Sequence, residues 1–166
     1  MDKDTLLKES LIQFYSNFSH FSTIKNIIED HSVVSLRTLD WFVTNYSKTH
    51  MCYLLPDVLP STLIHQSYKN QLKAYYKRYF DPFRRHERVF LCHDGLDAHL
   101  LTDAPNESVY VITTLGQMNF FRWVISHHIL EYVTIHMQAI EQDMNKNAQT
   151  DIKNVIAYVQ KNSNSI

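Results

Sequence analysis

The chain has only two glycines, Gly95 and Gly116, among its 166 residues. Loops that cradle phosphate groups use several glycines, in patterns such as GxGxxG, so that consecutive backbone N–H groups can converge on one anion. No such pattern occurs, and the GxSxG and HExxH motifs of hydrolases are also missing. We therefore expect a protein that is not an enzyme and has no nucleotide site. Gly116 is better explained by sterics, because a residue without Cβ lets a strand turn directly into a closely packed helix.

Cysteine is equally scarce, with Cys52 and Cys92 alone. A single disulfide is unusual in a reducing compartment, so we interpret both residues as buried free thiols. His50 with Cys52, and Cys92 with His93, make two pairs of soft metal ligands, but their spacing matches no familiar zinc finger. We therefore expect no metal, no cofactor and no small-molecule substrate.

Long hydrophobic runs are absent as well. No segment approaches the ~18 consecutive apolar residues of a membrane-spanning helix, and the opening MDKDTLLKES is too acidic and polar for a signal peptide. We therefore expect a soluble intracellular protein without a membrane span. Its length and its 45% apolar and 20% charged residues suit a single globular domain over 1–166. Residues 147–166 form either part of this domain or a C-terminal helical appendage.

The spacing of apolar residues predicts a mainly α fold with a small antiparallel β-hairpin (α+β), a compact helical domain of about six helices. The helices are expected over 5–18, 22–30, 35–50, 63–80, 115–144 and 150–159, with a bend near 127–128. The β-branched and aromatic runs at 88–92 and 108–113 predict the two strands of the hairpin, and 96–102 is a candidate third strand. Two prolines predict a surface connection over 51–62. Four large side chains are expected to bury much area, although one of them could lie in an interface: Trp41, Phe42, Phe121 and Trp123.

Positive charge is concentrated in residues 66–88, the basic segment, with the sequence QSYKNQLKAYYKRYFDPFRRHER. Its seven basic and two acidic residues give a local charge of +5, so the remainder carries −6 of the net charge of −1. Lys69, Lys73 and Lys77 are spaced to form one stripe along a helix. The candidate partner-binding residues, for protein or nucleic acid, are Lys69, Lys73, Tyr76, Lys77, Arg78, Arg84, Arg85 and Arg88.

Three interpretations of this segment remain open on charge alone. A basic stripe with interleaved aromatic residues can bind phosphate backbones and stack on bases. The same pattern can be the solvated face of an ordinary helix whose tyrosines belong to the core. It can also dock on an acidic protein partner.

Three long strings, at 35–50, 68–89 and 113–133, carry a family resemblance: SLRTLDWFVTNYSKTH, YKNQLKAYYKRYFDPFRRHERV and TTLGQMNFFRWVISHHILEYV. Together with EQDMN at 141–145, they resemble a family of short, uncharacterised proteins of nucleocytoplasmic large DNA viruses, the giant viruses. The family pattern has a cysteine where Arg84 stands, and many members continue into a basic tail. This chain ends instead in an amphipathic helix and KNSNSI, which weakens a nucleic-acid function.

The resemblance implies a setting and no catalytic residues. Giant viruses build large capsids that small internal proteins cement together, and they also package DNA with virion proteins. A small, aromatic-rich and charge-polarised protein suits the first task, because aromatic and arginine side chains anchor protein interfaces. We therefore expect a non-enzymatic virion protein, made in the cytoplasm of the infected cell, that contacts capsid proteins from inside the shell as a minor capsid protein. The alternative is a DNA-binding virion or gene-expression factor that uses residues 66–88.

Overall fold

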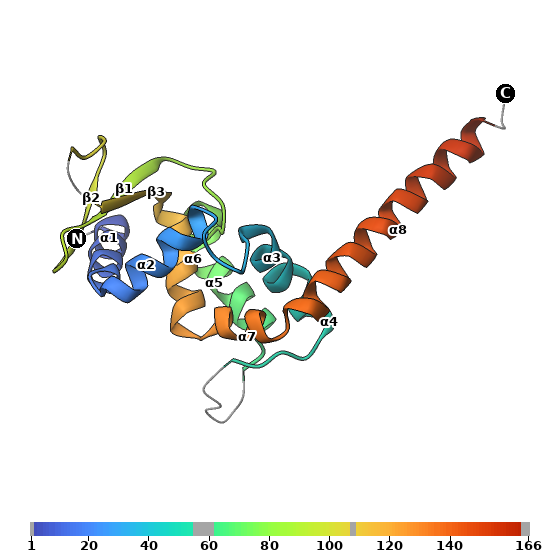
Figure 1. Cartoon of the computed structure of the whole chain (residues 1–166), viewed down its shortest axis with the longest axis horizontal. Helices are drawn as coiled ribbons and strands as arrows, with labels where there is room; N and C mark the ends of the chain where they lie inside the picture. The colour runs from blue at the N-terminus through green and yellow to red at the C-terminus, as the bar shows by residue number, and fades with distance from the viewer. Residues whose placement is uncertain (1, 55–61, 107–108, 164–166) are drawn as a thin grey trace.

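The structure is a computed structural model that describes residues 2–54, 62–106 and 109–163. Helices dominate, and a small antiparallel sheet lies at the end opposite to the tip of the long last helix (Figure 1). The predicted mainly helical α+β class is confirmed. Among these described ranges, no helix has both the length and the apolar character needed to cross a bilayer.

Two capped helices open the chain. The helix α1 (Lys3–Tyr15) is capped by Asp2, whose side chain accepts a hydrogen bond of 2.7 Å from the Thr5 N–H. Asn17 caps α2 (Phe18–Ile28) in the same way through the Ser19 N–H. Because this cap precedes the predicted start near residue 22, α2 is longer than its apolar spacing indicated.

The predicted helix over 35–50 is one helical stretch of three parts: α3 (Leu36–Trp41), the π-helical η1 (Phe42–Tyr46) and α4 (Ser47–Thr49). Ser35 caps it, with the Thr38 N–H donating to its Oγ at 3.1 Å. The bridge between Tyr53 and Leu63 then leads into α5 (Ile64–Tyr79). Most of the predicted surface connection lies outside the described residues.

The sheet has the strand order β2-β1-β3, formed by β1 (Arg88–His93), β2 (Ala98–Leu101) and β3 (Val109–Thr114). Leu91 in the central strand is opposite Val111 on one side and Leu100 on the other. The predicted hairpin is therefore confirmed, and the candidate segment 96–102 does supply a third strand. Residue 108, which was expected to begin β3, lies outside the described residues.

Three helices complete the chain: α6 (Leu115–Ser126), α7 (Ile129–Ile135) and α8 (Met137–Ser163). The bend predicted near 127–128 is a full break, because His128 has a left-handed backbone with φ 55°. A second break follows at His136. The predicted division into helices over 115–144 and 150–159 is wrong, because α8 runs without interruption from 137 to 163. Whether residues 147–166 are an appendage to a single domain stays a prediction.

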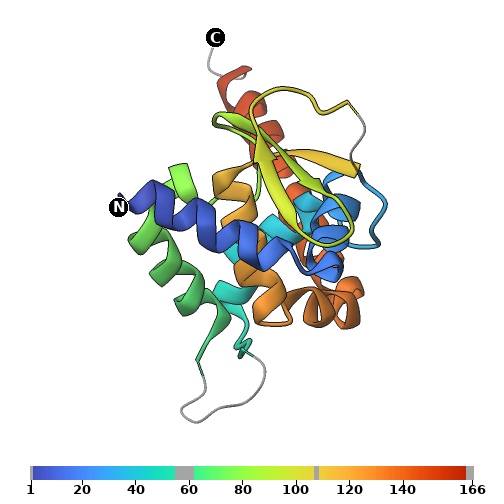
Figure 2. The same ribbon diagram turned by 90° about the vertical axis from the view of Figure 1, so that its left-hand side faces the viewer.

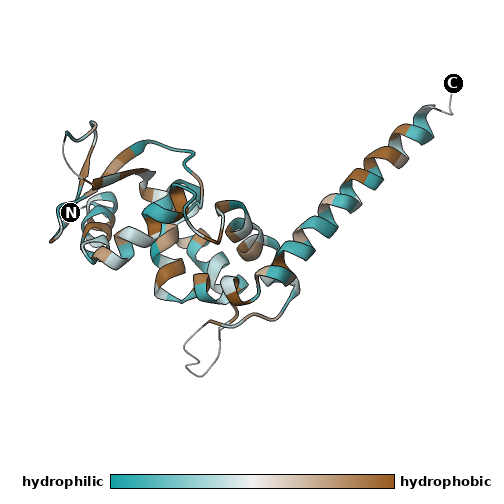
Figure 3. Ribbon diagram, viewed as in Figure 1, coloured by the Kyte–Doolittle hydropathy of each residue, from teal (hydrophilic) through white to brown (hydrophobic). Residues whose placement is uncertain are grey.

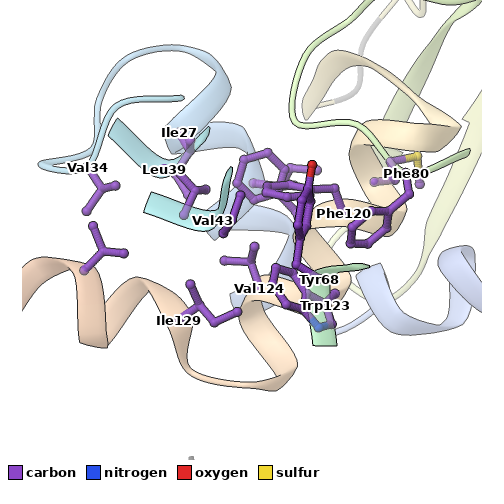
Figure 4. Close-up of a cluster of buried hydrophobic side chains, with 14 of the residues drawn as sticks. Ile27, Val34, Leu39, Val43, Tyr68, Phe80, Phe120, Trp123, Val124 and Ile129 are labelled. Carbon is purple, nitrogen blue, oxygen red and sulfur yellow. The ribbon is translucent and has the colours of Figure 1, made fainter. Parts of the chain in front are cut away.

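The helix α6 lies in the centre of the body, between α1, α2, α5 and the sheet (Figure 2). Most of its side chains are buried, including Phe120 and Phe121. They pack with residues from almost every other element in one cluster of apolar side chains (Figure 4). Of the four large side chains expected to be buried, Phe42, Phe121 and Trp123 are, whereas Trp41 is half-buried and donates its indole N–H to Asp143 in α8.

Candidate interaction surface

The basic segment begins on α5, whose apolar side faces the core. Tyr68 is buried, with its ring centroid 6.0 Å from that of Phe80 and 6.1 Å from that of Trp123. Lys69 and Lys73, one helical turn apart, are both exposed. This half of the helix therefore presents two lysines to solvent, as the spacing predicted.

The lysine stripe does not continue past Tyr76. This residue has φ 58° and ψ 171°, a non-helical conformation that kinks α5. Lys77 follows the kink, so the prediction that Lys69, Lys73 and Lys77 form one continuous stripe is wrong. Backbone in this region is almost restricted to glycine and costs about 1–3 kcal/mol for other residues. Tyr76 nevertheless points outward, with 73% of its surface exposed.

Long-range contacts fix the chain just after the kink. The Tyr79 hydroxyl donates to the Asp4 carboxylate of α1 at 2.6 Å. The Asn119 side chain of α6 donates to the Tyr79 carbonyl at 2.8 Å. The guanidinium of Arg78 lies 5.3 Å from the centroid of the Tyr79 ring, within the range of a cation–π interaction. The kinked turn is thus tied to both neighbouring helices.

The next four residues, 80–83, form a mostly buried turn against the start of α6. Gln117 donates from Nε2 to the Pro82 carbonyl at 2.8 Å, and its Oε1 accepts from the Thr113 hydroxyl at 2.7 Å. The Asp81 N–H donates to the Gly116 carbonyl at 3.2 Å. Buried polar groups that are fully paired hold their elements in one arrangement. Nothing in the sequence pointed to Gln117 as a partner of Pro82, or to Asn119 as a partner of Tyr79.

Gly116 is required by this contact. A Cβ on it would lie 2.9 Å from the carbonyl oxygen of Arg78 and 3.3 Å from the backbone nitrogen of Phe80. The steric explanation is therefore correct, but the close neighbour is the backbone at the end of α5 and not the preceding strand.

Two of the candidate arginines already have partners within the chain. Arg84 donates to the carbonyl of Ile112 in β3 at 3.2 Å. Arg85 Nε lies 3.5 Å from Asp81 Oδ2, an ion pair without a hydrogen bond to that oxygen, which is buried. The Arg85 guanidinium also lies 5.0 Å from the centroid of the Phe83 ring. Both arginines are thus held in place and have part of their charge offset.

A second carboxylate, Asp40 of α3, faces this turn. Burial raises the pKa of Asp40; the negative charge of Asp81 adds to this effect, while Arg85 and Lys77 oppose it. Burial also raises the pKa of Tyr68, and the charge of Asp40 contributes. No local pattern indicates this cluster, because α3 and the turn are about forty positions apart in the sequence.

Lys69, Lys73, Lys77 and Arg88 are all exposed, and the ion pairs formed between described residues include none of them. Together with Tyr76 and the three other arginines they form what we call the basic surface, whose members are Lys69, Lys73, Tyr76, Lys77, Arg78, Arg84, Arg85 and Arg88. Lys69 and Lys73 precede the kink at Tyr76, whereas Lys77 and the four arginines follow it.

The two pairs of soft metal ligands considered in the sequence are His50 with Cys52, and Cys92 with His93. Cys52 and Cys92 are buried free thiols, as expected. His93 is buried, donates from Nε2 to the Ser16 carbonyl at 2.9 Å and accepts the Gly95 N–H on Nδ1 at 2.9 Å. Both ring nitrogens thus serve the fold. Within the part of the chain that the structure describes, no three His, Cys, Asp or Glu side chains are grouped so that they could hold a metal ion.

Comparison with known proteins places the chain in a family. Residues 1–166 match DUF7197, a family of unknown function. The chain belongs to this family. It is also 38% identical over 135 residues to uncharacterized protein L507 of Acanthamoeba polyphaga mimivirus. The matched region covers 79% of this chain and 49% of that relative. The chain therefore spans about half the length of that curated relative. No solved structure matches this chain. The resemblance to an uncharacterised family of giant-virus proteins is thus confirmed.

Proposed function

We propose that the protein is a non-enzymatic structural component of the virus particle, a minor capsid protein that contacts capsid proteins from inside the shell. In this proposal it is made in the cytoplasm of the infected cell and its basic surface binds an acidic face of a capsid protein. The membership of a giant-virus family supports the viral setting.

The observation that carries the proposal is Tyr76. Tyr76 lies between Lys73 and Lys77, its side chain is exposed and its backbone is strained. Among the described residues, its side chain makes no hydrogen bond or ring contact that would offset this strain. Strain of this kind persists where the surrounding structure enforces it, and it is concentrated at binding sites. Tyrosine and arginine are also the side chains that most often anchor protein interfaces. Tyr76 therefore has the properties of a side chain that anchors an interface, with lysines on both sides of it.

The charges around the surface favour a protein partner over DNA. Arg84 and Arg85 are engaged by a backbone carbonyl and by Asp81, and the carboxylate of Asp4 lies beside Tyr79. A polyanion would meet these acidic groups together with the cations. A protein surface with its own pattern of charges can complement both signs, which fixes orientation and register.

The test is a virus that encodes the triple variant K69E/K73E/K77E. Its matched control is K3E/K48E/K146E, which reverses three exposed lysines outside the basic surface. We expect the first variant to be lost from the shell fraction of purified particles, and the control to be retained. Circular dichroism of both proteins should show an unchanged fold.

DNA binding by the purified protein decides the alternative. If the basic surface binds DNA phosphates, affinity should fall with a slope of about −0.9 per phosphate contact in a plot of log K against log salt concentration. Steep binding of this kind at physiological salt, abolished by K69E/K73E/K77E while the shell fraction is unchanged, would replace the capsid proposal with the DNA-binding one. Weak DNA binding together with loss from the shell would support the capsid proposal.

A further inference from the structure

The distal part of α8 stands free of the body. Ile140 is fully buried and Asp143 accepts the indole N–H of Trp41, but every residue of 145–163 is exposed. Figure 1 shows this part of the helix extending away from the rest of the molecule. A free segment of 19 residues is about 28 Å long at 1.5 Å per residue.

This free segment carries an apolar face. Ile152, Val155, Ile156 and Val159 follow the spacing i, i+3, i+4 and i+7, which places them on one side of a helix. Between 50% and 63% of the surface of each is exposed. Figure 3 shows the apolar bands that recur along the outer turns of α8. Four exposed β-branched residues on one face do not stabilise a helix that is surrounded by water.

The composition of the segment also argues for a partner. It holds four asparagines and four β-branched apolar residues, all weaker helix formers than alanine or leucine. Helices with such composition owe most of their stability to packing of an apolar face, because an isolated helix of this length is marginal in water. The segment should therefore be ordered by something that covers its apolar face.

We propose that the cover is the same segment of a second copy, packed antiparallel. In a heptad repeat the inward positions are Asn145, Ala148, Ile152, Val155, Val159 and Asn162. A two-fold axis between positions 153 and 154 places Ile152 opposite Val155 of the second copy and Ala148 opposite Val159. The end layers then pair Asn145 with Asn162, so polar side chains meet polar side chains at each end of the apolar centre.

The flanking residues select the antiparallel orientation. Asp151 and Tyr158 lie on one edge of the apolar face and Ile156 lies on the other. In an antiparallel pair like edges meet, so Asp151 faces the Tyr158 hydroxyl of the second copy, and the two Ile156 side chains lie on the same apolar edge. In a parallel pair opposite edges meet, so each Asp151 carboxylate would face Ile156. Burying a charge against an apolar side chain is costly, which disfavours that arrangement.

The length of the free segment fits the same register. With the axis between 153 and 154, Ser163 of one copy lies level with Met144 of the other. The overlap therefore uses all of the exposed part of α8 and ends where Met144 becomes half-buried against the body. The two bodies lie at opposite ends of the helix pair and do not compete for space. This dimer is independent of the basic surface and of its proposed partner.

The first test is the oligomeric state of the full chain by sedimentation velocity over a range of concentrations. We expect a dimer for the wild type and its loss in I152D/V155D, because each substitution would bury an unpaired charge. The matched control is N147D/N154D, which adds the same charge on the opposite face and should stay dimeric. A wild-type monomer at every concentration would refute the proposal. So would binding of the apolar face to lipid vesicles without dimer formation.

The second test is orientation. The variants N145C and N162C are mixed under oxidising conditions, with the buried native thiols retained. Antiparallel packing predicts a disulfide mainly between the two different variants, whereas a parallel pair would link N145C to itself. Disulfides within each single variant, at the expense of the mixed product, would therefore overturn the proposed arrangement.

Discussion

Replacement of Gly116 by alanine tests the contact that positions the basic segment. In an ordinary helix the change stabilises by about 0.5–1 kcal/mol, because alanine loses less conformational entropy on folding. Here the new Cβ would lie 2.9 Å from the Arg78 carbonyl oxygen, against an ordinary contact distance of 3.4 Å or more. The neighbours at Tyr79 and Phe80 are also backbone atoms, so no flexible side chain can move aside.

The structure can relieve this clash only by separating α6 from the turn. That movement lengthens two bonds of 2.8 Å, from Gln117 to the Pro82 carbonyl and from Asn119 to the Tyr79 carbonyl. Overpacking in a tight interior costs about 1–3 kcal/mol. We therefore expect G116A to lower the free energy of unfolding by about 1–3 kcal/mol, with a fall in melting temperature of about 2–4 °C per kcal/mol.

The assay is urea unfolding of G116A and wild type, with G95A as the comparison. Gly95 has φ +97° and open space where a Cβ would lie, so G95A destabilises only through backbone strain, and G95N should recover part of the loss. At position 116 asparagine should be worse than alanine, because size sets the cost. A G116A protein as stable as wild type would refute the close approach of α6 and the turn.

Three further experiments test other parts of the structure. Burial raises the pKa of Asp40, so the free energy of unfolding falls as the pH rises above the ordinary pKa of 3.8 and this carboxyl ionises inside the folded protein. D40N should therefore be at least as stable as wild type in urea at about pH 7, and the difference in stability should shrink as the pH falls toward 3.8. A D40N protein that is less stable than wild type would mean that attraction of the carboxylate to Arg85 and Lys77 dominates. Burial raises the pKa of both the Cys52 and Cys92 thiols, so a thiol reagent should label native protein slowly and unfolded protein quickly, and equal rates would contradict the burial. Y76G should be more stable than Y76A by about 1–2 kcal/mol, the reverse of the order in a regular helix; if Y76A is the more stable, Tyr76 is helical.

Local sequence signals predicted most elements of the fold. The change from helical to alternating spacing at Arg88, and back at Thr114, located β1, the end of β3 and the start of α6 to within a residue. Ser35, which caps α3, is a residue type that favours helix N-termini, and the bend at His127 and His128 was predicted. These features depend on neighbours in the chain, which is why periodicity and capping residues indicate them.

The errors come from contacts between distant residues. Nothing in the string KAYYKR indicates a kink at Tyr76, and the contacts that hold the neighbouring Tyr79 come from Asp4 and Asn119, which are 75 and 40 positions away. The polar residues of 145–151 resembled a break between two helices, yet they contain neither glycine nor proline and α8 continues through them. Polar composition alone gave the wrong boundary, because a helix can continue through polar residues where no glycine or proline ends it.

The candidate surface was predictable as a set of charges and not as a shape. The spacing of Lys69 and Lys73 correctly indicated an exposed face of a helix. The hydrogen bond from Arg84 to Ile112 was not visible in the sequence, because the two residues are 28 positions apart. The ion pair of Arg85 with Asp81 was not visible either, because residues 81–85 have no regular secondary structure from which it could be predicted. Counting charges therefore overestimated the cations that a partner can meet freely.

Two of the strings through which the chain resembles its family turn out to be two sides of one contact. The backbone carbonyls of Tyr79 and Pro82 face α6, and a buried carbonyl without a donor costs about 1–3 kcal/mol. The amides of Gln117 and Asn119 supply those donors, and Gly116 supplies the space. An apolar side chain at either amide position would leave a carbonyl unpaired, and any side chain at Gly116 would push the turn away. Gly116, Gln117 and Asn119 in α6 are thus explained by the backbone of the basic segment. If the basic surface binds a partner as proposed, a change at these buried positions should alter that binding without removing any of the charges.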